Sequence, residues 1–290
     1  MLGLALHSEP AQIVVMTAEP LIAHLKTRAV IAVSGADARN FLQGLLTQEV
    51  ETLAVGELRF GALLSPQGRL LFDLFLLGSE DGVWLDVAAD QSEALVQRLT
   101  MYRLRAKVEL SAADAGVYVA FGPLPSVIPE AAQRLSGTQG WRGDPRLSAL
   151  GWRAYGTFAA NAAEADYDTH RLSLGVPGSA DWGTDKTYPI EADFDLLNGI
   201  DFGKGCFVGQ ETTSRMKRRG IIKSRMLPIT FDGPAPAPGT EVLAGELRAG
   251  EVLSGVNGRA MALVRLDRAV GSALKVDGRP AHVETPDWMP

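Results

Sequence analysis

Short runs of β-branched and large apolar residues recur through the first 115 residues and predict several strands and two helices. RAVIAVSG (28–35) ends in glycine and is typical of a strand, as are VWLDV and AKVEL further on. Apolar residues at helical spacing predict amphipathic helices over 35–48 and 91–103. Two apolar runs flank S-P-Q-G (65–68), where proline followed by glycine predicts the turn of a hairpin.

The pattern changes twice after residue 115. Strand-like runs (VYVAFG, GWRAYG) and a predicted helix over 163–174 occur without the regular alternation of a doubly wound sheet, so the sequence predicts an α+β fold. Near residue 231 a Pro/Gly-rich stretch begins, followed by short strand-like runs separated by glycines. That texture predicts a small antiparallel barrel or sandwich. The expected domains are therefore 1–115, 116–224 and 225–290.

Composition limits the class of protein. With 46% apolar and 21% charged residues, the 290-residue chain can form a packed core. A net charge of −6 gives no general reason to expect nucleic acid or an anionic membrane as a partner. One cysteine excludes an internal disulfide framework and fits a reducing compartment. The first 16 residues resemble neither a signal nor a transit peptide, and Met16 is an alternative start. We expect a cytoplasmic monomer.

Common catalytic motifs are absent from the sequence. There is no G-x-G-x-x-G after a strand, no complete phosphate loop, no H-E-x-x-H, no C-x-x-C and no G-x-S-x-G. The four histidines are scattered, and we predict no metal site.

The segment D-F-G-K-G-C-F-V-G-Q-E (201–211) holds the only cysteine. A short helix is predicted over 210–219, beginning after Gly209 and ending at a glycine. Cys206 would lie just before its N-terminus with Lys204 nearby, and both features favour a thiolate. The alternative is that Cys206 is a small buried apolar residue in a glycine loop. Six Lys/Arg and no acid follow between 215 and 225, forming either a solvated face or a docking site for a polyanion or an acidic partner.

These motifs resemble a known family. K-G-C-F-V-G-Q-E, together with SGADARNFLQGLLTQEV, GALLSPQGRLLFDLFL and YRLRAKVEL, resembles the YgfZ family of folate-binding proteins, which are related to the aminomethyltransferase of the glycine cleavage system. The same family includes a mitochondrial factor for iron–sulfur protein maturation. The resemblance covers most of residues 28–225.

The resemblance implies a fold, a ligand and a role. The implied fold has aminomethyltransferase-like α+β domains around a central hole, with a C-terminal antiparallel β-barrel. The implied cofactor is tetrahydrofolate or a one-carbon derivative, and a transient iron–sulfur cluster is a further candidate. The implied role is support for synthesis or repair of iron–sulfur clusters, including those of tRNA methylthiolation enzymes. The implied partners are client enzymes or assembly proteins.

The resemblance also implies site residues. Cys206 is the functional thiol, with Lys204 beside it, and Asp73 is the catalytic candidate on the hairpin. The folate-binding candidates are Gln67, Arg69, Tyr167, Arg171, Glu191, Gly205, Gly209, Gln210, Glu211 and Arg215.

Several of these residues have a structural alternative. Aminomethyltransferases carry an Asp-Asp pair where this chain has Phe72-Asp73, which weakens a transferase interpretation, and Asp73 could instead face water at a strand edge. Tyr167 could stack on a pterin, whereas Arg28 could pair with a carboxylate. Glu191 could bind the pterin edge or be a first-turn helix acid.

The remaining candidates have alternatives of the same kind. Arg171 could bind a folate carboxylate or pair with Asp168 on an exposed helix. Gln67 and Arg69 could line the hole or be turn residues. The hypotheses at this point are a folate-binding accessory protein, a folate-dependent aminomethyl or one-carbon transferase, and a basic docking module.

Overall fold

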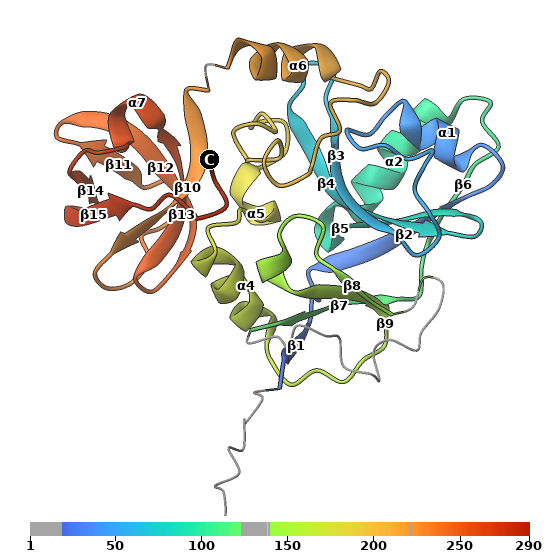
Figure 1. The fold of residues 1–290 in the computed structure, drawn as a ribbon, viewed down its shortest axis with the longest axis horizontal. Coiled ribbons are helices and arrows are strands. Elements are labelled where there is room, and N and C mark those ends of the chain that lie inside the picture. The colour runs from blue at the N-terminus through green and yellow to red at the C-terminus, as the bar shows by residue number, and fades with distance from the viewer. Residues whose placement is uncertain (1–18, 123–137, 139, 221) are drawn as a thin grey trace, which may run out of the picture.

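The computed structural model describes residues 19–122, 138, 140–220 and 222–290. The alternative start at Met16 lies outside these residues. Three sheets make up the fold, and Figure 1 shows the C-terminal barrel on one side, a five-stranded sheet with its helices on the other, and a four-stranded sheet between and below them. Among the described residues, no helix combines the length and the apolar character needed to cross a membrane.

The five-stranded sheet has the order β3-β4-β5-β2-β6. Its elements, with the helices attached to it, are β2 (Arg28–Ser34), α1 (Ala38–Gln43), β3 (Leu58–Leu64), β4 (Leu70–Ser79), β5 (Gly82–Ala88), η1 (Ala89–Gln91), α2 (Ser92–Arg103) and β6 (Glu109–Ala112). The predicted hairpin is confirmed as β3 and β4, and Gly68 has φ +84° in its turn. The helix predicted over 35–48 is shorter than expected, since α1 ends before Gly44.

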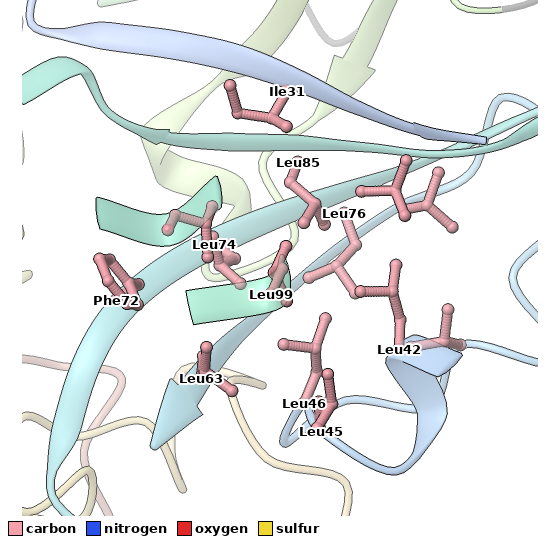
Figure 2. Packing of buried hydrophobic residues seen from close by; sticks show 14 of the residues in the cluster. Ile31, Leu42, Leu45, Leu46, Leu63, Phe72, Leu74, Leu76, Leu85 and Leu99 are labelled. Atoms are coloured by element: carbon pink, nitrogen blue, oxygen red, sulfur yellow. The ribbon is translucent and has the colours of Figure 1, made fainter. Parts of the chain in front are cut away.

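Strand β4 is buried along its whole length because apolar layers cover both of its faces. Phe72, Leu74 and Leu76 point into a core with side chains from α1, α2 and the strands beside them (Figure 2). Phe75 belongs to a second core that reaches toward the barrel. A register shift opposite Leu63 and Leu64 precedes this alternation. Asp73 therefore lies on the face shared with Phe75.

The four-stranded sheet has the order β1-β7-β9-β8. It and the helical segments after it consist of β1 (Leu21–His24), β7 (Gly116–Phe121), β8 (Trp141–Gly143), η2 (Ser148–Leu150), β9 (Trp152–Gly156), α4 (Glu164–Ser173) and α5 (Ser179–Trp182). The helix predicted over 163–174 is confirmed as α4, whose first turn carries two acids and whose last turn carries His170 and Arg171. Figure 1 shows α4 and α5 between this sheet and the barrel.

The barrel is closed, with the strand order β10-β13-β12-β11-β14-β15. Its elements are β10 (Ser224–Phe231), β11 (Glu241–Ala244), β12 (Leu247–Val256), β13 (Arg259–Arg265), α7 (Leu266–Ala269), β14 (Leu274–Val276) and β15 (Arg279–Val283). The interior is filled by small and branched apolar side chains, such as Ile229, Val252 and Ala262. Closure leaves no open edge for pairing with another chain.

The helix predicted after the cysteine is confirmed as α6 (Gln210–Arg219). Gly209 precedes it with φ +80°, and a Cβ at this position would lie 2.6 Å from the Ser65 carbonyl oxygen. Only glycine combines that conformation with so close an approach to the hairpin turn. Gly220 ends the helix in the left-handed region. Figure 1 shows α6 across the top of β3 and β4.

Candidate functional site

A cavity of about 700 Å³ lies where the three sheets meet. Its wall takes residues from β2, β4, α4, α5 and the barrel strand β12. The charged and aromatic side chains of that wall are Arg28, Asp73, Phe75, Asp90, Arg146, Arg153, Glu164, Tyr167, Asp168 and Arg171. Pockets of roughly 300–1,000 Å³ are typical of sites for small organic ligands.

Arg28 is the centre of the buried charge network behind this wall. Its Nη1 donates to Asp73 Oδ2 at 2.7 Å and to Ser179 Oγ at 2.8 Å, and its Nε donates to Asp86 Oδ1 at 2.6 Å. Burial alone would lower the pKa of Arg28, but the carboxylates of Asp73 and Asp86 outweigh it and raise that pKa above its usual value. The pairing of Arg28 with a carboxylate, one of the sequence-based alternatives, is therefore present.

Asp86 connects this network to the neighbouring sheet. Its Oδ2 accepts from Arg153 Nη1 at 2.7 Å and from the Tyr155 hydroxyl at 3.1 Å. Burial and the Asp86 charge raise the pKa of Tyr155, which keeps its hydroxyl a donor. The Arg153 guanidinium lies 3.8 Å from the centre of the Phe75 ring. One carboxylate thus fixes two guanidinium groups and a phenol.

Asp73 does not face water at a strand edge. The residue is 3% exposed because β4 is a covered inner strand, and its Oδ2 is held by Arg28. Its Oδ1 is buried without a hydrogen-bond partner among the described residues. An unsatisfied buried acceptor costs free energy, so a donor that reached this oxygen would be bound favourably.

Tyr167 and Arg171 also line the cavity, but their side chains are already engaged. The Tyr167 ring packs edge-on against Phe121, with ring centres 5.4 Å apart, and its hydroxyl accepts from Arg146 at 3.0 Å. Tyr167 is 4% exposed, so little of its ring surface is available for stacking on a pterin. Arg171 pairs with Asp168 at 3.4 Å, as the structural alternative predicts, but it is buried rather than exposed and also donates to the Val176 carbonyl at 2.5 Å.

The cysteine and its signature form a second region, outside the cavity lining. Cys206 is exposed, which contradicts the alternative of a buried apolar residue. Lys204, two residues earlier, is buried and donates to the carbonyl oxygens of Gln43, Leu46 and Gln48 at 2.7–2.8 Å. Burial lowers the pKa of Lys204 to about 8. All three ammonium donors are used, so Lys204 anchors the loop that presents the thiol.

The other predicted residues of the signature gather near this loop, the hairpin turn and α6. Gly205, Gln67, Glu211 and Arg215 are exposed, and Gly209 and Gln210 are half-buried. Arg69 stacks over the Tyr188 ring at 4.7 Å and donates to the Lys186 carbonyl. None of these residues is among those that line the cavity.

Glu191 lies near Arg69 of the hairpin, whose charge acts on its carboxylate. Its Oε2 accepts from the Tyr188 backbone N–H at 3.0 Å, as a first-turn acid does, and burial raises its pKa. It is not among the residues that line the cavity.

The basic run is only partly a solvated face. Arg225 is buried and pairs with Asp193 at 2.5 Å and Asp195 at 3.0 Å, fastening the first barrel strand to the preceding segment. Lys217 also reaches Asp195, at 3.2 Å. The exposed cations that remain are Arg215, Arg218, Arg219 and Lys223.

Sequence reasoning missed the buried half of the network. The sequence predicts no role for four side chains of this network, which it places only in strands and loops: Asp86, Arg146, Arg153 and Tyr155. Asp86 in V-W-L-D-V and Arg153 in G-W-R-A-Y-G sit in strands whose other residues are mostly apolar, and such a charge must be paired if it is buried. A charged residue within an apolar strand is therefore the sequence feature that indicates a buried ion pair here. Among the described residues, no three His, Cys, Asp or Glu are grouped in a way that could hold a metal ion.

Comparisons with known proteins bear on the whole chain. Residues 223–290 match the family model described as CAF17, C-terminal beta-barrel domain. The iron–sulfur cluster assembly factor IBA57, mitochondrial, of Homo sapiens is 30% identical over 300 residues, covering 92% of this chain and 84% of the relative. The mouse protein of that name is 29% identical, with the same coverage. A Neurospora crassa homolog is 32% identical, and there the match spans 54% of the relative's length.

The fold has a solved counterpart. The crystal structure of glycine cleavage system aminomethyltransferase T from Bartonella henselae matches with a TM-score of 0.75 at 20% identity, covering 94% of this chain and 87% of that chain. The predicted aminomethyltransferase-like fold with a C-terminal antiparallel barrel is confirmed. At this identity the likeness concerns the fold alone.

The prediction of a cytoplasmic protein is contradicted, because the relatives from human, mouse and Neurospora crassa are named mitochondrial. A lone unpaired cysteine indicates a reducing environment but does not tell one reducing compartment from another.

Proposed function

This chain belongs to the family of iron–sulfur cluster assembly factors named IBA57, and from that premise we propose that it takes part in iron–sulfur cluster assembly as a folate-binding protein. In this proposal the central cavity binds tetrahydrofolate or a one-carbon derivative. Cys206 acts outside the cavity as the functional thiol toward assembly proteins or client enzymes.

The observation that carries the folate proposal is the unpartnered Oδ1 of Asp73 in the wall of the cavity. A reduced pterin presents several N–H donors, and a buried carboxylate oxygen is a strong acceptor for one of them. The cavity volume of about 700 Å³ suits a ligand of this size. Arg28 holds the other carboxylate oxygen, so the acceptor is oriented before any ligand arrives.

Two features support the proposal for the thiol: the Cys206 side chain is exposed, and its loop is anchored to the protein. Cys206 is accessible, while Lys204 ties its loop to three backbone carbonyls. A thiol that is presented on a held loop can meet a group on another protein with little cost of ordering.

The folate test is titration calorimetry with tetrahydrofolate under anaerobic conditions. We expect Asp73→Asn to weaken binding about tenfold or more, since a charged hydrogen bond contributes roughly 1.5–3 kcal/mol. Glu93→Gln is the matched control, an exposed acid-to-amide change on α2. Equal affinity of Asp73→Asn and the unaltered chain, with both folded, would remove Asp73 from the site.

The thiol test uses cells that lack the unaltered gene. We expect Cys206→Ala to lower the activity of iron–sulfur client enzymes, with tRNA methylthiolation as one readout, while folate binding by the purified variant persists. Full client activity in that variant would exclude the thiol from the function.

Aminomethyl transfer remains the alternative activity. The observation that bears on it is that Arg28 occupies Asp73 Oδ2, which leaves one oxygen of the single carboxylate on β4. We expect no turnover with an aminomethylated lipoyl carrier and tetrahydrofolate. Turnover that is lost in Asp73→Asn would favour the transferase instead.

A further inference from the structure

The buried and the exposed parts of the cavity wall carry different charges. The four arginines that line the cavity, Arg28, Arg146, Arg153 and Arg171, all have side chains no more than 9% exposed. Each of them is paired with a carboxylate of the chain, at 2.6–3.3 Å. The deep part of the cavity is therefore close to charge balance, although Arg153 Nε has no hydrogen-bond partner among the described residues.

The outer part of the wall has the opposite character. Its ionisable side chains are Asp90, Glu164 and Asp168, all of them acids. Glu164 is held in place by the backbone N–H of Lys26 at 3.0 Å and by Thr27. Asp168 pairs with the Arg171 Nε at 3.4 Å, but its side chain is 56% exposed, so water screens much of that attraction. Among the described residues, the three acids outnumber the one exposed cation beside them, Lys26, which adjoins the lining residue Thr27.

The basic run does not compensate for this acidic rim. Its exposed cations follow Gly209 on and beyond α6, and none of them lines the cavity. The position of the basic run relative to the cavity therefore gives no support to the sequence-based alternative that this run binds a polyanionic part of the cavity ligand.

On the basis of the proposed folate function, we propose that the cavity takes monoglutamyl folates and gains nothing from a polyglutamyl tail. A tail that leaves the cavity past Asp90, Glu164 and Asp168 would bring additional carboxylates toward like charges. Such repulsion acts over a Debye length, which is about 10 Å at 0.1 M salt and longer at low salt. The rim thus selects the ligand by the charge of its outer end.

The test compares the monoglutamyl and pentaglutamyl forms of tetrahydrofolate by calorimetry at low and at high salt. In the unaltered chain we expect the pentaglutamyl form to bind no more tightly than the monoglutamyl form. In Asp90→Asn/Asp168→Asn we expect the pentaglutamyl form to gain about threefold at low salt, as two screened repulsions of a few tenths of a kcal/mol predict, and to lose that gain at high salt.

The matched control is Glu93→Gln/Glu246→Gln, which removes two exposed acids from α2 and from the barrel, away from the cavity. We expect no change in the ratio of the two affinities in this variant. A pentaglutamyl form that binds tenfold more tightly to the unaltered chain would overturn the inference, and so would an unchanged ratio in the Asp90/Asp168 variant. Absence of binding by both forms would instead overturn the proposed folate function itself.

Discussion

The cavity and the Cys206 loop use charge in opposite ways. In the cavity, arginines and carboxylates neutralise one another inside the protein, and among the described residues Asp73 Oδ1 and Arg153 Nε are left without a hydrogen-bond partner. At the Cys206 loop, the buried cation Lys204 donates its hydrogen bonds to backbone carbonyls, and the thiol is exposed to solvent.

The difference shows how one hairpin serves two regions. The turn between β3 and β4 contacts Gly209 at the start of α6, and β4 then carries Asp73 into the cavity wall. Because β4 is covered on both faces, the Asp73 carboxylate is fixed by its hydrogen-bond partner. The loop beyond Lys204 lies at the protein surface, where one side faces solvent. The interior is suited to holding a ligand still, and the surface loop is suited to meeting another protein.

The largest effect is expected from Asp86→Ala, which breaks the cavity side of the comparison. The change leaves Arg153 without its carboxylate and removes one partner of Arg28. We expect the free energy of unfolding to fall by about 3–5 kcal/mol, the usual cost of breaking a buried ion pair. Urea denaturation measures it, with exposed Asp90→Ala as the control. A loss below 1 kcal/mol, on the order of a surface substitution, would mean that the network is not structural.

A smaller effect is expected from Lys204→Met on the loop side. Three backbone carbonyls, one buried and two part-buried, lose their donor, and we expect about 2–3 kcal/mol of destabilisation with faster amide exchange in residues 43–48. Lys217→Met is the matched control, since Lys217 is 44% exposed and its pair with Asp195 contributes about 1 kcal/mol or less. Equal effects of the two changes would contradict the anchoring role of Lys204.

A still smaller effect tests whether the two regions are separate. Cys206 is exposed and absent from the cavity lining, so we expect saturating tetrahydrofolate to change its alkylation rate by less than about twofold. Iodoacetamide labelling followed by mass spectrometry measures the rate. Strong protection by the ligand would show that the cavity and the thiol act as one site.

The smallest effect is expected from Arg218→Glu/Arg219→Glu at the end of α6. Both side chains are exposed in the last helical turn, where a cation interacts favourably with the helix dipole by roughly 0.3–1 kcal/mol. We expect a loss of stability on that order by thermal denaturation. A much larger loss would place these residues with Arg225, in the structural part of the basic run.

Much of the fold was predictable from local pattern. The β3–β4 hairpin, α4 and α6 lie where their turn and capping residues predict them. The length of the helix predicted over 35–48 was overestimated. Leu45 and Leu46 pack in the same core as Leu42 of α1, but from an irregular segment after Gly44. Helical spacing of apolar residues therefore predicted their burial correctly but not their backbone.

The site was predictable only where residues are close in sequence. The signature led to Cys206 and Lys204, but not to the fact that Lys204 turns inward while Cys206 turns outward. Asp73 was found from its motif, whereas Asp86 and Arg153 carried no motif, and their role depends on pairing across two sheets. Such pairing involves residues 58 and 67 positions from Asp86 along the chain, beyond the reach of any local pattern.

By itself, the sequence determined the order of elements, the short antiparallel strands of the C-terminal domain and the glycine positions around the thiol, because these follow from side-chain period and the conformations that glycine alone allows. Only the tertiary structure decided which charges neutralise each other, which carboxylate oxygen is left without a partner, and that the thiol lies outside the cavity lining. The physical reason is that the energy of a charge depends on its burial and on its neighbours in space, and neither is a property of the residue or of its neighbours in the chain.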